Sequence, residues 1–102
     1  MKIPKVLTVC GQSIQIKYVK DLKVEGKDCW GCYDSDKHEI CLREGMEKTR
    51  EMEILLHEVL HAIESIHTLA LPERAIKILG IEILAFIRNN KINLLERRVP
   101  AK

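Results

Sequence analysis

The chain has 102 residues, of which 46% are hydrophobic and 31% are charged, an ordinary composition for a soluble globular protein. This length provides one hydrophobic core and no room for a second lobe, so we expect a single domain over residues 1–102. The formal net charge of +2 is too small to indicate a nucleic-acid partner.

No segment predicts a membrane span or a secretion signal. The longest apolar run in the second half, Ile83 to Ile87, is far shorter than the roughly 20 residues that a spanning helix needs. The N-terminus carries Lys2 and Lys5 but no apolar stretch long enough for a signal peptide. We therefore expect a cytoplasmic protein whose thiols are reduced.

The first half of the chain predicts two β-hairpins. Apolar and polar residues alternate before and after Gly11-Gln12, a pattern typical of two strands joined by a tight turn. A second pair of alternating segments flanks the turn-rich stretch 34–37. The predicted strands cover residues 6–10, 14–18, 30–33 and 38–42, and residues 21–28 are predicted to form a loop.

The second half predicts two helices. Over residues 47–66 the apolar positions follow the 3.6-residue period of an amphipathic helix. Residues 68–71 form a connection, and Pro72 suits the first turn of a second helix that runs to about Asn89. Because strands come first and helices second, the order favours the α+β class. Residues 91–102 are predicted to be a C-terminal extension.

The motif that narrows function most is His57-Glu58-Val59-Leu60-His61, an HExxH sequence inside the first predicted helix. On a helix, His57 and His61 lie one turn apart on the same face and can share a zinc ion. Glu58 between them can act as a general base on a water molecule at the metal. The pattern alone arises in about 2% of shuffled sequences of this composition, so its helical context matters.

A catalytic zinc usually has three protein ligands, and the sequence offers two candidates for the third. The first is Glu82, which is the only charged residue between Lys77 and Arg88 in the second predicted helix. Burial of a lone carboxylate in such an apolar segment is costly unless it is paired or bound to a metal. The alternative for Glu82 is a solvent-exposed position or an ion pair with an arginine.

The second candidate is His67, because the spacing of His57, His61 and His67 matches that of HExxHxxGxxH zincins. That motif needs a glycine where this chain has Glu64, since the helix must stop there. A helix that continues to position 67 would place His67 about 9 Å along the axis from His61, too far to share a metal. Glu64 itself is expected to lie beside the ligands or on the surface.

Four cysteines provide a further candidate site, with Cys29 and Cys32 in a CxxC motif and Cys10 and Cys41 elsewhere. Such a set can indicate structural zinc or a redox pair. However, positions i and i+3 of a regular strand point to opposite faces, so only a kink at Gly31 would bring the CxxC sulfurs together. Free thiols, with Cys32 and Cys41 close across the second hairpin, are the competing interpretation.

With these motifs, the chain resembles the small phage and prophage zincin-like proteins, compact relatives of the ImmA/IrrE and SprT-like metallopeptidases. The resemblance covers the chain from about Lys5 to Asn90, and HExxH is its only specific motif. The other matching features are the Ile3-Pro4-Lys5 start, Trp30-Gly31, the hairpin from Asp34 to Ile40, and Arg88-Asn89-Asn90 at the end of the second helix.

The resemblance implies a minimal zincin fold, in which a small antiparallel sheet of two hairpins packs on the HExxH helix. It implies that His57 and His61 bind zinc and that Glu58 is the catalytic base. It also implies an acidic third ligand near position 81 or 82, where this chain has Ile81 and Glu82.

The expected function is therefore zinc-dependent hydrolysis of peptide bonds in a specific protein, with a phage repressor-type target by analogy. Glu58 would take a proton from water and pass it to the leaving amine. The substrate would bind as an added strand along an edge near residues 38–42.

The competing hypothesis is a catalytically silent zincin-fold binding module, an anti-repressor or toxin-type partner that uses zinc structurally. A homodimer through the apolar second helix is a further expectation. We expect Ile76, Leu79, Ile83 and Ile87 to face the core, and Ile81 and Leu84 to form the contact surface.

Overall fold

A computed structural model describes residues 3–90 of the chain, and the extension predicted at 91–102 lies outside the described residues. Six strands precede two helices, so the α+β class is confirmed. The strands are β1 (Val6–Val9), β2 (Gln12–Val19), β3 (Lys23–Val24), β4 (Lys27–Asp28), β5 (Gly31–Asp34) and β6 (Glu39–Arg43); the helices are α1 (Lys48–Ile66) and α2 (Glu73–Asn89).

Both predicted hairpins form, but they join in a way that was not predicted. Strands β1 and β2 pair antiparallel, as do β5 and β6, whereas β2 and β6 pair in parallel to give the order β1-β2-β6-β5. The sheet is therefore mixed rather than wholly antiparallel. The two central strands carry fully buried side chains, among them Ile14 and Ile40, which favours their position in the middle of the sheet.

The segment 21–28, predicted as a loop, contains a separate two-stranded ribbon of β3 and β4. Its turn is formed by Glu25 and Gly26, both with positive φ, as a two-residue hairpin turn of this kind requires. This ribbon is short because only four residues take part in pairing.

Strand β6 has neighbours on both sides, β2 and β5, so the expectation that a substrate adds to residues 38–42 is wrong. Its backbone N–H and C=O groups are already used in the sheet. In the described part of the chain, β5 is the edge strand at that end of the sheet. A peptide that extends the sheet there would have to pair with Gly31–Asp34.

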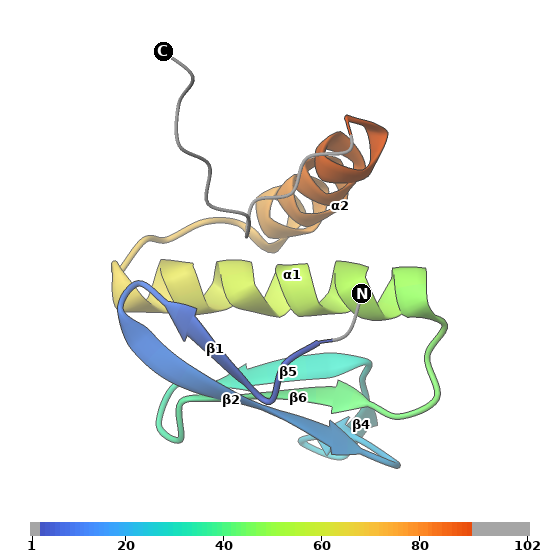
Figure 1. The fold of residues 1–102 in the computed structure, drawn as a ribbon. Coiled ribbons are helices and arrows are strands. Elements are labelled where there is room, and N and C mark those ends of the chain that lie inside the picture. Colours follow the sequence, from blue (N-terminus) through green and yellow to red (C-terminus); the bar gives the residue numbers. More distant parts are fainter. Residues whose placement is uncertain (1–2, 91–102) are drawn as a thin grey trace.

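The molecule has three layers, with α1 between the sheet and α2 (Figure 1). One face of the sheet packs on α1, and α2 crosses α1 on the side away from the sheet. The buried cluster between sheet and helix contains Val9, Ile14, Ile16, Ile40, Leu42, Leu55 and Ala62. The middle of α1 is thus held from two sides, which gives its side chains a rigid support.

Helix α1 begins one residue later than predicted, with Glu47 as its N-cap, and it ends at Ile66 as predicted. The Glu47 carboxylate accepts a hydrogen bond from the Arg50 backbone N–H at 3.2 Å, which satisfies one free donor of the first turn. The helix passes through Glu64 without a break, as expected for a residue that is not glycine. Pro72 is the N-cap of α2, just outside the helix.

The apolar residues of α2 are distributed differently from the prediction. Leu84 was expected at the surface but is buried, whereas Leu79 and Ile83 were expected in the core but are exposed. Ile76 is buried as predicted. A helix that packs on a single neighbour buries only a narrow stripe, so an apolar residue on its outer side stays in water. Neither described helix has the combination of length and apolar character that a membrane crossing requires.

Candidate metal centre

The two histidines of HExxH meet on one face of α1, as the helical spacing predicts. The Nε2 atoms of His57 and His61 are 3.2 Å apart, and the rings lie edge to face with centroids 4.8 Å apart. Both side chains are partly buried, with exposed fractions of 20% and 29%. They are therefore shielded by the fold yet open to an ion on one side.

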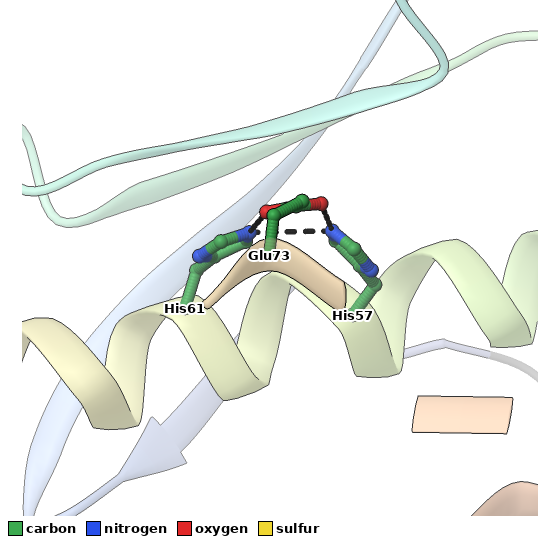
Figure 2. A group of neighbouring side chains, drawn as sticks. All are labelled: His57, His61 and Glu73. Carbon is green, nitrogen blue, oxygen red and sulfur yellow. Dashed lines mark hydrogen bonds and ion pairs between the residues drawn. The ribbon is translucent and has the colours of Figure 1, made fainter. Parts of the chain in front are cut away.

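The third member of the group is Glu73, the first residue of α2. Its Oε2 atom is 2.9 Å from Nε2 of His57, and its Oε1 atom is 3.0 Å from Nε2 of His61. Figure 2 shows the carboxylate lying across the gap between the two rings. Among residues 3–90, these three are the only group of His, Cys, Asp or Glu side chains close enough together to hold a metal ion.

The packing of the helices explains why Glu73 reaches the histidines. The connection between α1 and α2 reverses the chain, so the start of α2 returns over the middle of α1 (Figure 1). The two helices come close at Gly80, where a Cβ atom would lie 3.6 Å from the His57 backbone nitrogen, an ordinary van der Waals contact that an alanine could still make. A larger side chain at position 80 would push the helices apart and move Glu73 away.

The donor set fits a zinc ion. Zinc–ligand bonds of about 2.0–2.1 Å in a tetrahedral site place the ligand atoms about 3.3–3.4 Å from one another. The Nε2 atoms of His57 and His61, 3.2 Å apart, are close to this separation. Glu73 contacts the two histidines through its two different oxygens, and one ligand atom from each of the three residues lies within 4.8 Å of the others. Two imidazoles and one carboxylate form the ligand set of a common class of catalytic zinc site. Glu73 is 67% exposed, which leaves the site accessible from that side.

Glu64 orients His61, as a residue beside the ligands would. Its Oε1 atom is 3.2 Å from Nδ1 of His61, and its Oε2 atom accepts a hydrogen bond from the Leu71 backbone N–H at 2.8 Å. A carboxylate at Nδ1 favours the proton on that nitrogen, so Nε2 keeps its lone pair for a metal. The bond to Leu71 also ties the site to the connection between the helices.

Glu58 is the one buried charged residue of the described chain, with 8% of its surface exposed. Burial raises the pKa of its carboxyl group to about 7, with Glu73 adding to the rise and His61 opposing it. Its Cγ atom lies close to Gly31 of β5, where an added Cβ would be 3.4 Å away. The carboxyl group is thus held between α1 and the edge strand, with a pKa suited to proton transfer near neutral pH.

The structure does not bring Glu82 or His67 to the histidines, so Glu82 is wrong as the third ligand. Glu82 is nine residues beyond Glu73, which places it about 13 Å along α2 and on the opposite side of the helix. It is exposed to solvent. His67 is the exposed C-cap residue of α1, more than one turn beyond His61, as the uninterrupted helix at Glu64 predicts.

Sequence reasoning missed Glu73 because an acidic residue in the first turn of a helix is ordinary. Such residues stabilise the positive end of the helix dipole and carry no signal of metal binding. The usable signal was the short connection after α1, which returns the first turn of α2 towards the HExxH motif. The apolar surroundings of Glu82 were a misleading signal, since they face solvent rather than the core.

Two depressions open on either side of Glu58 and the edge strand. One, of about 640 Å³, borders His61 and includes Val24, Tyr33 and Leu69 in its wall. The other, of about 430 Å³, borders His57 and Glu73 and is walled by Trp30, Arg50 and Lys77 among others. The Arg50 guanidinium lies 4.8 Å from the centre of the Trp30 ring, a cation–π contact that braces this wall.

The cysteines do not form a metal site in the described part of the chain. Cys32 and Cys41 are directly paired across β5 and β6, whereas Cys29 precedes β5 and its thiol lies near the Leu22 carbonyl. Burial raises the pKa of the Cys32 thiol to about 11 and also raises the pKa of Cys41. The cysteines are free thiols, and Cys10 is exposed in the turn after β1.

Comparison with known proteins found no family model, no curated protein and no solved structure that matches this chain.

Proposed function

We propose that the protein is a small zinc-dependent peptidase that resembles the compact zincins of phages and prophages. The observation that carries this proposal is the group of His57, His61 and Glu73 beside the buried carboxyl group of Glu58. Neither the group of possible metal ligands nor Glu58 would be sufficient alone. A metal without a base and a base without a metal are both weak hydrolytic sites.

His57, His61 and Glu73 would hold the zinc ion, and Glu64 would keep His61 in the correct tautomer. Zinc, when bound, supplies a Lewis acid that makes water more acidic and polarises a peptide carbonyl. The carboxylate of Glu58 takes the proton from the attacking water and holds it in a site largely closed to solvent. It then gives that proton to the amine that leaves.

The edge strand β5 supports a peptide substrate in extended conformation. Its outer backbone groups have no strand partner in the described chain, so a peptide can pair with it and lie across Glu58. Side chains on the two sides of the cleaved bond would then enter the two depressions. Val24, Tyr33 and Leu69 make the larger one suitable for an apolar side chain.

The test uses the full chain, loaded with zinc and then freed of excess metal. We expect about one zinc ion per chain by elemental analysis, and the loss of that ion in His57→Ala. Zinc-loaded protein is then incubated with a mixed peptide library, and new termini are identified by mass spectrometry. Glu58→Gln is the matched variant, because it keeps the shape of the side chain and should retain zinc yet abolish cleavage.

Two results would overturn this proposal in different ways. A carefully prepared protein that binds no near-stoichiometric zinc would exclude a zinc site altogether. A wild type that binds zinc but cleaves nothing in the library would favour the competing function, a binding module of the anti-repressor or toxin-partner type that uses the metal structurally.

A further inference from the structure

Exposed apolar side chains cover a broad part of the α2 surface on the side away from α1. Phe86 is 57% exposed and Ile78 is 47% exposed, and Leu79, Ile81 and Ile83 are also exposed. The opposite side of the helix, with Ile76, Gly80 and Leu84, is buried against α1. In Figure 1 no other described element covers α2 on its outer side. Such a concentration on one short helix marks a contact surface.

Two opposite charges lie within this apolar surface. One ridge along the helix contains Arg74, Ile78 and Glu82, which follow one another at intervals of four residues. Each residue lies about 6 Å along the helix axis from the next. Within residues 3–90, neither Arg74 nor Glu82 takes part in an ion pair. Arg74 lies as far before Ile78 as Glu82 lies after it. Two copies of this ridge, centred on Ile78 and running in opposite directions, would therefore place opposite charges against each other.

We propose that the chain forms a symmetric homodimer in which two α2 helices pack antiparallel about Ile78. A two-fold axis at Ile78 places Arg74 of each chain opposite Glu82 of the partner subunit, so both ion pairs form at once. Packing of four-residue ridges against each other is the commonest way in which two helices meet. A parallel arrangement would instead place Glu82 beside its own copy, which is repulsive.

The dimer would leave the candidate metal centre open. Glu73 lies on the part of α2 that faces α1, well round the helix from Ile78. The proposal is therefore independent of whether the protein cleaves peptides. It also accounts for Glu82, which interrupts the apolar surface and would otherwise weaken it.

The test measures the oligomeric state of the full chain by sedimentation velocity over a wide range of concentrations. We expect a monomer–dimer equilibrium for the wild type. Arg74→Glu and Glu82→Arg each replace two attractive contacts by two repulsive ones and should raise the dissociation constant about tenfold or more. In a mixture of the two variants, a heterodimer restores both opposite-charge pairs. The mixture should therefore dimerise more tightly than either variant does alone.

Lys77→Glu is the matched control, because it makes the same charge change as Arg74→Glu on the same helix but outside the ridge. It should leave the dissociation constant within about threefold of wild type. A wild type that is monomeric at every concentration overturns the proposal, as would be the case if another segment or another protein covered the surface. A dimer that survives in the single variants, or fails to form in their mixture, overturns the antiparallel arrangement.

Discussion

HExxH on α1 and CxxC at the start of β5 are both short motifs of residue types that can bind metals, yet only HExxH brings its side chains together in a candidate site. On the helix, four-residue spacing places the Nε2 atoms of His57 and His61 3.2 Å apart. On the strand, Cys32 instead pairs with Cys41 of β6, and Cys29 turns towards the β3–β4 ribbon. The difference shows that the spacing of two residues in the sequence predicts how close their side chains lie only where the secondary structure that carries them is known.

The largest expected effect on zinc affinity separates Glu73, which lies between the two histidines, from residues that lie away from them. Glu73→Gln removes a carboxylate that bridges both histidines, so zinc affinity should fall at least about 100-fold, since even supporting residues around a metal contribute 10–100-fold. Titration with a competing chelator measures the change. Glu82→Gln and Cys32→Ser are the controls, and both should remain within about threefold of wild type.

The opposite pattern, with zinc lost in Glu82→Gln or Cys32→Ser and retained in Glu73→Gln, would show that a different set of residues binds the metal. Glu73 is two-thirds exposed, so its replacement should not disturb the fold. Circular dichroism of each variant provides that check.

An effect of intermediate size, on the stability of the fold, is expected at Gly31, the glycine of the CxxC motif. A Cβ atom at Gly31 would lie 2.6 Å from Cγ2 of Ile54 on α1 and 3.3 Å from the Cys41 carbonyl oxygen. Gly31→Ala should therefore separate β5 from α1 and lower the free energy of unfolding by about 1–3 kcal/mol, measured by urea denaturation. The role of Gly31 is then to allow β5 to approach α1 closely, rather than to bring the sulfurs of Cys29 and Cys32 together.

The control for this prediction is Cys29→Ser, which changes the motif without adding volume and should cost less than about 1 kcal/mol. A Gly31→Ala variant as stable as wild type would contradict the tight contact between β5 and α1. In that case the position of Glu58 against the edge strand would also have to be looser than the structure indicates.

The smallest effect concerns the reactivity of the thiols. Burial raises the pKa of Cys32 to about 11, so at pH 8 only about one thiol in a thousand is ionised in the folded protein. In a variant with Cys32 as the sole cysteine, burial remains the largest cause that raises the pKa, so alkylation should be slow at pH 8 and accelerate as the pH rises. In denaturant, where the pKa returns to its ordinary value, the reaction at pH 8 should be fast.

Rapid alkylation of folded Cys32 at pH 8 would contradict this assignment and would revive the strand cysteines as a redox or metal pair. Reaction rates followed by mass spectrometry distinguish the two outcomes. The HExxH motif on α1 is expected to behave independently of this result.

Much of the secondary structure could be predicted, because alternation and helical periodicity are local properties. Both hairpins and both helices lie close to their predicted bounds. The strand order could not be predicted, since either hairpin could present either of its strands to the other. This choice decided that β6 is interior and that β5 is the free edge beside Glu58.

The sequence by itself determined the pairing of His57 and His61 and the position of Glu58 next to them. The regular geometry of one helix is sufficient for both, because each relation spans at most four residues. The passage of the helix through Glu64 is equally local, and it separates His67 from His61 because an uninterrupted helix carries the chain away from the metal-binding face.

Only the tertiary structure decided the third member of the site. Glu73 and Glu82 lie on the same helix, and the direction from which α2 returns over α1 determines which of them meets the histidines. That direction depends on the chain reversal between the helices and on the close approach at Gly80. Both are relations between distant residues, and periodicity along one helix contains no information about them.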